Sequence, residues 1–593
     1  MAEFEPFDNT TGSSNPGRDC QRVGTANFLE EDPGNIHGDV WAVIGNQGDS
    51  QCYLGVQRKV EAIQAALKER IPGLTRPVRL LDPNYVGGIS DGQLNGTDRM
   101  RFSLVGRETT NDGVCLHLSG SDVKGTIAVV ACDKPPVGTL AALIEHNEPA
   151  IIMSDGSIRP GRDPETGDRI DIVSCFQVAG DPDLQKRARY ALNACPGYGS
   201  CGGMFTYNTM QSFMAVTGME PLDMVSPASE DPRRVTDFPN QLIDYLQIMT
   251  ERNIRPRDII TPVSLKNAMT VALALGGSTN VILHAPEIAR AAGIDFWTDV
   301  MTQDAFNQLS RKVPVLTNVR PFGVYSMVDI DEEGGLPVVV KELLDANLLD
   351  GSCITCTGET LAEQVAKLSP PQPDGEVIYP ISNPYKETGG LRLLSGNLAP
   401  EGGAVVKVAG IESGMHEGIF FGRARTFNSE AALLQALTST PHIFQDKDIV
   451  VIRYEGPKGA PGMPEMLDPT SRITTLCRER NIVIALMTDA RFSGGSVGLV
   501  VGHVGPEAYE GGPIALVADN DTIVIDLADN SLNCLELADP RIMESRSAAL
   551  RQAILDNGGI HPDVRPINNR LLARMRATAS PALKGSGMSG QNS

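Results

Sequence analysis

The sequence predicts an α/β protein, with an N-terminal α/β domain on a largely parallel sheet and a C-terminal β-rich domain. In the first part of the chain, apolar runs of strand length alternate with segments whose apolar residues recur at helical spacing, which predicts a parallel sheet. Beyond residue 375, short β-branched runs are separated by Gly, Pro and Asx turns, a pattern typical of a compact β-rich domain. The length of 593 residues allows two large domains.

The N-terminal elements follow one another in a regular order. After a polar arm at residues 1–35, which predicts irregular structure, VWAVIGN at residues 40–46 is typical of a buried strand. A helix is predicted over residues 56–70. The same order recurs in GTIAVVACDK and VGTLAALIEHN, and PAIIMSDG is a further apolar run. The pattern then becomes mainly helical, most clearly at residues 238–253, 264–293 and 335–349.

Domain boundaries follow from these patterns. Residues 36–368 form the predicted α/β domain, and LSPPQPDG at residues 368–375 is the predicted linker, because its prolines continue neither a helix nor a strand. Residues 376–580 form the predicted β-rich domain, with strands in runs such as DIVVIRYEG and NIVIALMTDARFSGG. Residues 581–593, PALKGSGMSGQNS, predict a flexible tail.

Charge and hydropathy exclude two classes of partner. Asp and Glu number 73 against 51 Lys and Arg, so the net charge is −22, whereas a nucleic-acid partner requires a basic face. No run of about 18 apolar residues occurs, and the first residues lack the basic and apolar regions of a signal peptide. We therefore expect a cytoplasmic protein with no nucleic-acid or membrane partner.

Three of the eleven cysteines stand out by their position. Cys52 and Cys132 follow apolar runs in IGNQGDSQCYLG and VVACDK, and Cys201 precedes a predicted helix in CPGYGSCGGMFTYNTM. Side chains beyond the carboxyl ends of parallel strands meet in one crevice. Three thiolates there could hold an iron–sulfur cluster, leaving one iron position open to act as a Lewis acid. The alternative is that all three are small buried core residues.

Other cysteines leave alternatives open. Cys195 lies six residues before Cys201 and could compete for the ligand role. Cys353 and Cys356 have the CxxC spacing of redox and zinc motifs, and a redox protein built on them is a third possible function. This pair lacks a second pair or flanking His residues, which favours a structural role.

Three carboxylates offer hard oxygen ligands. Asp133 directly follows Cys132, Asp91 lies in GGISDGQ after a predicted strand, and Glu465 lies in EGPKGAPGMPEML. Such a set suits Mg²⁺, which prefers octahedral oxygen coordination and keeps its waters. Taken singly, each residue is also explained as a cap or turn residue.

Two glycine-rich segments could bind an anion. In DARFSGGSVG, Ser493 precedes two glycines, which let backbone N–H groups approach an anion while the hydroxyl acts as base or nucleophile. GGSTN at residues 276–280 is similar, and either segment is also explained as an anion cradle or a helix N-cap. The GxxxxGK[ST], GxSxG and HExxH patterns are absent, which excludes the common NTPase, serine hydrolase and metalloprotease classes.

Seven motifs occur in order between about residue 40 and residue 535: ACDK, CGGMFTYNTM, ALGGSTN, SGNLAPEGG, VIRYEGPKGAPGMPEML, TDARFSGG and VGHVGPEA. Together they resemble the dihydroxy-acid and sugar-acid dehydratase family, which also includes phosphogluconate dehydratase. The resemblance implies a cluster-bearing α/β domain and a barrel-like C-terminal domain that carries the catalytic base. It also implies a homodimer or dimer of dimers, with the active site between the domains.

The resemblance also implies roles for particular residues. The implied ligands of a [2Fe-2S] cluster are Cys52, Cys132 and Cys201. The implied ligands of Mg²⁺ are Asp91, Asp133, Glu465 and Lys134, the last after carbamylation. The implied base is Ser493, acting as an alkoxide on the C2 proton. The expected substrate-binding residues are Ser278, Thr279, Gly494 and Gly495.

The implied reaction dehydrates a small 2,3-dihydroxy carboxylic acid to a 2-oxo acid. Mg²⁺ would bind the substrate carboxylate and absorb charge as the C2 proton leaves, and the open iron would bind the C3 hydroxyl. Carbamylation explains a lysine among metal ligands, where an ammonium would be repelled. Ser493 would need a strongly depressed pKa to act.

Departures from the family pattern bear on the substrate. SDGQLNGTDRMRFSLVGRE replaces the DGI and MGH-like pattern of many branched-chain members, Glu359 in TGET stands where Lys is usual, and a GRNMAGAR-like segment is missing. RFSGG and PGMPEML are closer to the dihydroxy-acid branch, so we expect a dihydroxy-acid dehydratase. A sugar acid such as an aldonate, or glycerate, is the alternative substrate. A non-catalytic metal-binding homologue would lack Ser493, Glu465 or Lys134, and all three are present.

Overall fold

The N-terminal part of the chain is built on a five-stranded sheet in which every strand pair is parallel. Its strands are β1 (Asp39–Gln47), β2 (Val78–Leu80), β3 (Asn84–Gly87), β4 (Val123–Val130) and β5 (Ala150–Ser154). The order is β2, β1, β4, β5, and β3 also pairs with β1. Strands β1 and β4 are buried along almost their whole length, as expected for central strands covered on both faces. The predicted parallel sheet is confirmed.

The structure is a computed structural model that describes residues 16–28, 37–179, 181, 183–408, 414–496 and 498–588. Helices α2, α4, α5 and α10 contact the sheet, and α8 and α13 pack against α5. The helices before the barrel are α1 (Pro16–Phe28), α2 (Val56–Arg70), α3 (Asp91–Leu94), α4 (Phe102–Gly120), α5 (Pro135–His146), α6 (Ile172–Gln177), α7 (Leu184–Asn193), α8 (Thr206–Thr217), α9 (Arg233–Thr236), α10 (Phe238–Arg252), α11 (Pro256–Ile259), α12 (Pro262–Ala274), α13 (Val281–Ala291), α14 (Gln303–Lys312), α15 (Met327–Glu332), α16 (Leu336–Asp345) and α17 (Leu361–Leu368). A small hairpin joins β6 (Gly161–Arg162) to β7 (Arg169–Ile170).

The segment at residues 264–293, predicted as mainly helical, contains a break. Helix α12 ends at Ala274 and α13 begins at Val281, so the GGSTN residues form a connecting loop. Gly276 has a φ of 68°, which an L side chain rarely adopts and which ends the helix. The break places Ser278, Thr279 and Asn280, all almost fully buried, inside the protein.

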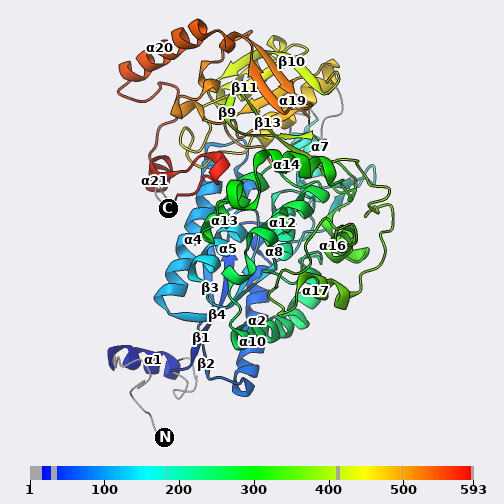
Figure 1. The fold of residues 1–593 in the computed structure, drawn as a ribbon, viewed down its shortest axis with the longest axis vertical. Coiled ribbons are helices and arrows are strands. Elements are labelled where there is room, and N and C mark those ends of the chain that lie inside the picture. Colours follow the sequence, from blue (N-terminus) through cyan, green and yellow to red (C-terminus); the bar gives the residue numbers. More distant parts are fainter. Residues whose placement is uncertain are drawn as a thin grey trace.

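The C-terminal part closes into an eight-stranded barrel, drawn in yellow and orange at the top of Figure 1. Its strands are β8 (Leu391–Gly396), β9 (Ala399–Lys407), β10 (Ile419–Phe427), β11 (Asp448–Ile452), β12 (Ala485–Thr488), β13 (Val500–Gly502), β14 (Thr522–Asp526) and β15 (Ser531–Cys534). The strand order around the barrel is β10, β11, β12, β13, β9, β8, β15, β14. Strands β10 to β13 pair in parallel, β8 pairs with β15 in parallel, and the other pairs are antiparallel. Its helices are α18 (Glu430–Ser439), α19 (Leu467–Arg480), α20 (Pro540–Asp556) and α21 (Arg570–Thr578). The expected β-rich, barrel-like domain is confirmed.

A shared apolar core joins the barrel to the α/β domain. Leu104 of α4 and Leu283 of α13 are fully buried in one cluster with Val450 of β11 and Leu486 of β12. Burying such side chains stabilises the junction by about 1.5–3 kcal/mol each. The barrel therefore has a fixed position on α4 and α13, and its loops face the carboxyl edge of the parallel sheet.

The sequence predicted irregular structure for the whole N-terminal arm, but part of this arm is helical. Helix α1 occupies residues 16–28 of this arm, and the other residues of the predicted arm fall outside the described residues. The polar, Gly-containing composition of this segment hid the helix because propensity is a weak guide where few apolar residues mark a face.

The predicted flexible tail is also different in the structure. Of residues 581–593, those up to 588 are described, and Ser586 is fully buried. The Gly585 carbonyl accepts a hydrogen bond from Arg107 of α4 at 2.8 Å. The small residues that suggested a loose end instead fit a narrow space: a Cβ on Gly587 would lie 2.3 Å from the Glu287 carboxylate.

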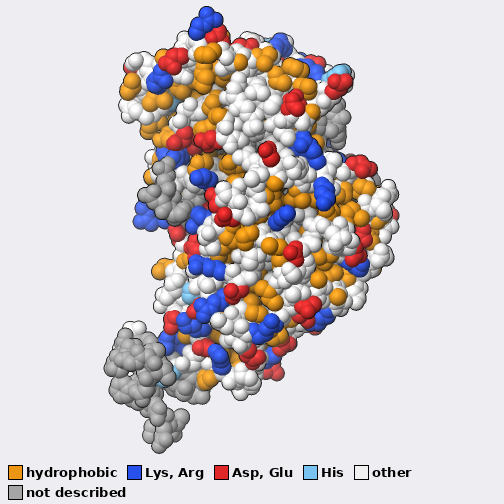
Figure 2. All heavy atoms as spheres, viewed as in Figure 1, with side chains coloured by type: hydrophobic (Ala, Val, Ile, Leu, Met, Phe, Trp, Pro, Cys, Tyr) orange, Lys and Arg blue, Asp and Glu red, His pale blue; other side chains and the backbone are white. Residues whose placement is uncertain are grey.

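Acidic and basic side chains are interspersed over the face shown in Figure 2, which has no large basic area. Among the described residues, no helix combines the length and apolar character that crossing a membrane requires.

Candidate active site

Two short segments at the carboxyl edge of the sheet carry most of the predicted ligands. Residues 89–91 lie beyond β3, and residues 132–134 directly follow β4. Both strands pair with β1 in parallel, so their ends meet at one edge. Cys132 has a φ of 64°, a strained conformation that turns the chain sharply. After this turn, Cys132 and Lys134 each reach a different residue of the 89–91 segment.

The carboxylates of Asp91, Asp133 and Glu465 surround the Lys134 ammonium, with Asp91 and Glu465 buried and Asp133 partly buried. Oxygen atoms of the three carboxylates lie within 4.8 Å of one another. Lys134 Nζ donates to Asp91 Oδ2 at 2.6 Å and to Glu465 Oε1 at 3.4 Å, and it lies 4.0 Å from the Asp133 carboxylate. The structure thus brings together four residues that the sequence separates by up to several hundred positions.

The pKa values in this cluster shift in opposite directions. Burial, together with the charges of Asp91 and Glu465, raises the pKa of Asp133 to about 7. For Asp91, burial is outweighed by Lys134 and Arg491, which lower its pKa. For Lys134, burial and Arg491 are outweighed by the carboxylates, which raise its pKa. These anions therefore depend on nearby positive charge to stay ionised.

The donor set fits a hard divalent cation. Asp91 Oδ1 is buried and has no hydrogen-bond partner within the part of the chain that the structure describes. Carboxylate oxygens are the ligands that Mg²⁺ prefers. The unmodified Lys134 ammonium supplies positive charge among the three carboxylates, and carbamylation would convert it into a further oxygen donor.

Two residues that the sequence analysis did not single out complete the cluster. Arg491 pairs with Glu465 Oε1 and donates to Ser103 Oγ at 2.8 Å. Asn280 Nδ2 donates to Glu465 Oε1 at 2.8 Å. Both lie inside the motifs TDARFSGG and ALGGSTN, so the motifs marked their position, but only the packing of the barrel on the α/β domain reveals what they contact.

The three predicted cluster cysteines also come together. Cys52 Sγ lies 3.9 Å from Ser90 Oγ, and Cys132 Sγ lies 3.7 Å from the Ile89 carbonyl. The Cys132 N–H donates to Ser200 Oγ at 2.8 Å, which holds the segment before Cys201 against the end of β4.

The pKa values of these thiols argue against a thiol-based reaction. A hydrogen bond with Cys52, and then burial, raise the pKa of Cys132 well above its ordinary value, and burial does the same for Cys201. Buried thiols with such pKa values are inert as free nucleophiles, whereas metal binding deprotonates them. The donor set therefore fits an iron–sulfur cluster better than a thiol-based reaction.

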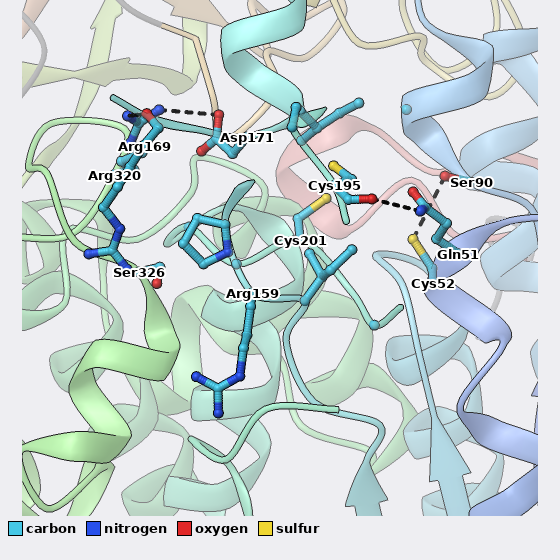
Figure 3. Close-up of a pocket in the computed structure, with 18 of the residues that line it drawn as sticks. Gln51, Cys52, Ser90, Arg159, Arg169, Asp171, Cys195, Cys201, Arg320 and Ser326 are labelled. Atoms are coloured by element: carbon cyan, nitrogen blue, oxygen red, sulfur yellow. Dashed lines mark hydrogen bonds and ion pairs between the residues drawn. The ribbon is translucent and has the colours of Figure 1, made fainter. Parts of the chain in front are cut away.

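A pocket of about 180 Å³ opens beside these thiols (Figure 3). Cys52 and Cys201 line it, and Cys195 lies beside Cys201 in the same wall. The structure therefore leaves Cys195 near the predicted ligands. Across the pocket, Arg320 lies 3.3 Å from Asp171, so a charged pair forms part of the facing wall.

Ser493 is half-buried in the loop between β12 and β13, and its Oγ accepts a hydrogen bond from the Gly495 N–H at 3.3 Å. A Cβ on Gly494 would lie 2.7 Å from Phe205 Cα, so the glycine lets this loop touch the chain just after Cys201. On its other side, Arg491 forms a parallel β-bridge with Glu465. The loop therefore lies beside both the thiols and the carboxylates.

Ser278 and Thr279 form side-chain contacts behind the Ser493 loop. Ser278 Oγ lies 3.3 Å from Thr206 Oγ1, and Thr279 Oγ1 donates to the Phe492 carbonyl at 3.3 Å. Neither is among the residues that line the thiol pocket. Their contact with a substrate stays a prediction, and the geometry gives them a supporting position behind the Ser493 loop.

The CxxC pair lies at the opposite end of α8, where the Cys356 N–H donates to the Gly218 carbonyl at 2.7 Å. Burial raises the pKa of Cys356, and burial with Asp350 raises that of Cys353 to about 11. A redox thiol requires the opposite shift.

Glu359, which departs from the family pattern, pairs with Lys367 at 2.9 Å. It does not line the thiol pocket, so this departure leaves the pocket unchanged.

A Gly494→Ala substitution should disturb the Ser493 loop, because its Cβ would meet the backbone of Phe205 at 2.7 Å. We expect kcat to fall by about 100-fold, the size of effect that a displacement of about 1 Å produces at a catalytic group. Gly73→Ala is the matched control, since its Cβ meets nothing within 4 Å. Wild-type activity in Gly494→Ala would contradict the close approach of the two segments.

Sequence comparisons agree with this architecture. The profile of the dihydroxy-acid/6-phosphogluconate dehydratase N-terminal domain matches residues 79–364, and that of the corresponding C-terminal domain matches residues 376–586. With thiols and carboxylates gathered between an α/β domain and a barrel, the chain belongs to this dehydratase family, a class of carbon–oxygen lyases.

Particular relatives narrow the comparison. Dihydroxy-acid dehydratase 2 of Corynebacterium efficiens is 41% identical over 472 residues, covering 78% of this chain and 80% of the relative. The dihydroxy-acid dehydratase of Nocardioides sp. is 42% identical, covering 75% of this chain and 76% of the relative. The chloroplastic dihydroxy-acid dehydratase of Arabidopsis thaliana is 42% identical, covering 75% and 72%.

Proposed function

We propose that this protein dehydrates a 2,3-dihydroxy carboxylic acid to a 2-oxo acid, as a dihydroxy-acid dehydratase. The observation that carries the proposal is the buried cluster of Asp91, Asp133 and Glu465 directly beside the thiols of Cys52 and Cys132. Hard and soft donors at adjacent positions suit a substrate whose carboxylate and hydroxyl must be held at once. The similarity to relatives named dihydroxy-acid dehydratases supports the same substrate class.

In the proposed mechanism, Asp91, Asp133, Glu465 and carbamylated Lys134 hold Mg²⁺, and Cys52, Cys132 and Cys201 hold a [2Fe-2S] cluster. When bound, these groups supply Lewis-acid positions for the substrate carboxylate and the departing C3 hydroxyl.

Ser493 removes the C2 proton in this mechanism. The electron pair of the C2–H bond forms the C2–C3 double bond as the C3–O bond breaks, and the hydroxyl leaves as water once the proton is returned. The resulting enol tautomerises to the 2-oxo acid. Ser278, Thr279, Gly494 and Gly495 are the proposed substrate-binding residues. Thr279 also donates a hydrogen bond to the Phe492 carbonyl next to Ser493.

The substrate class is tested by side-by-side turnover. We expect anaerobically purified enzyme to convert 2,3-dihydroxyisovalerate, with gluconate and glycerate as comparison substrates. Conversion of gluconate or glycerate alone would assign the chain to the sugar-acid branch. The proposed homodimer is tested on the same preparation by light scattering.

The cluster is tested by composition rather than by activity. We expect about two irons and two sulfides per chain, and their loss in Cys52→Ser. Cys477→Ser is the control, since Cys477 lies in α19, outside the thiol pocket. About four irons per chain would indicate a [4Fe-4S] cluster, and absence of iron would contradict the proposed mechanism.

A further inference from the structure

One buried lysine has no place in the mechanism above. Lys407 is the last residue of β9 and is 1% exposed, although a charged side chain is rarely buried without a partner of opposite charge. Its Nζ donates to the Gly494 carbonyl at 3.0 Å. Lys407 therefore contacts the residue directly after Ser493, from the barrel side of the loop.

Within the described part of the chain, Lys407 forms no ion pair with a carboxylate. Among the described contacts of its ammonium are the Gly494 carbonyl and the ring of Phe322, whose centroid lies 4.3 Å from Nζ. Lys386 lies 5.3 Å from the centroid of the same ring. Burial, and repulsion by Lys386, lower the pKa of Lys407 to about 7.

Phe322 ties this lysine to the pocket. It belongs to the short segment that also carries Arg320 and Tyr325, and both of these line the thiol pocket. Gly494, which accepts the hydrogen bond from Lys407, is itself packed closely against the backbone of Phe205, just after Cys201. Lys407 therefore lies between the Ser493 loop and a wall of the pocket, and any shift of its ammonium moves one of them.

We propose that Lys407 is a positioning residue that holds the Ser493–Gly494 turn and places a positive charge beside the serine that takes the substrate proton. The inference rests on the proposed function, since it assigns a role relative to Ser493. A nearby cation favours the charged form of an acid, so an ammonium here helps a serine hydroxyl to ionise. The hydrogen bond to the carbonyl of residue 494 fixes the turn at the same time.

Lys407→Met tests the proposal, because methionine keeps the length and apolar stem of lysine and removes the donor and the charge. We expect kcat for 2,3-dihydroxyisovalerate to fall by about 10-fold to 100-fold with KM changed less than about threefold, the pattern for a group that acts in the transition state. Iron, sulfide and bound Mg²⁺ should match the wild type. Lys407→Arg keeps the charge and the donor, and should recover part of kcat.

The pH profile separates this role from simple packing. Wild-type kcat should decline as rising pH removes the Lys407 proton, and Lys386→Met should move that decline to higher pH because a repelling charge is gone. Lys407→Arg should lose the decline. An unshifted profile in Lys386→Met would overturn the electrostatic role even if Lys407→Met failed to fold.

Stability gives a readout that does not depend on turnover. Because the pKa of Lys407 falls from 10.5 to about 7 on folding, the unfolded chain binds more protons between these values, so wild-type stability rises with pH through that window. The melting temperature of the wild type should therefore rise relative to that of Lys407→Met between pH 7 and pH 10. A constant difference would contradict a buried, titrating Lys407.

The variants distinguish a failure of the positioning role of Lys407 from a failure of the proposed function. Wild-type kcat in Lys407→Met, with Ser493→Ala inactive, would overturn the positioning role and leave the proposed function intact. An active Ser493→Ala enzyme would overturn the proposed base, whatever Lys407→Met does.

Discussion

Ser493→Ala should abolish most turnover while leaving the metal and cluster content unchanged. Removal of a positioned base lowers the rate by about 10²-fold to 10⁴-fold. Ser493 is half-buried, and its Oγ accepts one weak hydrogen bond from the Gly495 N–H. Within the described chain, its side chain forms no hydrogen bond with a proposed metal ligand. The substitution therefore removes the hydroxyl at little cost to the fold. Steady-state kinetics with iron and Mg²⁺ analysis of the same sample measures both effects.

Ser496→Ala is the matched control for this variant. Ser496 lies three residues away in the same loop, and its buried hydroxyl has no hydrogen-bond partner among the described residues. Its loss should change kcat little. Equal loss of activity in both variants would indicate a general disturbance of the loop and would contradict a specific role for Ser493.

Glu465→Gln should have the second large effect, on Mg²⁺. Glu465 Oε1 contacts Arg491 and Lys134 and accepts a hydrogen bond from the Asn280 amide, so its charge balances two cations. Neutralising it leaves Lys134 and Arg491 with Asp91 and Asp133 only, and removes one proposed ligand. Loss of a residue that merely orients a ligand weakens metal binding by 10-fold to 100-fold, so we expect Mg²⁺ to bind at least about 100-fold more weakly.

Titration calorimetry with Mg²⁺ measures this loss directly. Glu430→Gln serves as the control, because burial and Glu455 raise the pKa of Glu430 to about 8, so its carboxyl is largely protonated at neutral pH and glutamine mimics it. Glu430→Gln should bind Mg²⁺ as the wild type does. Unchanged Mg²⁺ affinity in Glu465→Gln would remove this carboxylate from the proposed site.

The sequence predicted the fold class well because the evidence for it is local. Strand–helix alternation around β1 and β4 and the β-branched runs after residue 375 each depend on residues close in the chain. The barrel closure was different, because it pairs Val406 of β9 with Val501 of β13 and Ser395 of β8 with Ser531 of β15. Periodicity does not reveal pairings between strands so far apart in the chain, and the barrel expectation came from the resemblance.

The candidate site divides in the same way. Cys132 and Asp133 could be found because they directly follow a strand, and Lys134 came from the family resemblance. Arg491 and Asn280 act through Glu465, a contact that exists only once the barrel has packed on α13. The only sign of Lys407 in the sequence is a single charge in the apolar run GGAVVKVAG. The packed end of the chain was missed because Gly and Ser are typical both of loose tails and of narrow gaps.

The way the last residues pack has a consequence for how the enzyme is made. The guanidinium of Arg107, 1% exposed, finds an acceptor in Gly585, the indole N–H of Trp297 donates to Leu583, and Glu108 accepts from the N–H of Met588. Those partners follow the barrel in the sequence, so the first domain cannot satisfy these interior groups until the chain has been synthesised through residue 588. A protein cut short at residue 580 would keep every proposed catalytic group yet expose donors that cost about 1–3 kcal/mol each to leave unpaired.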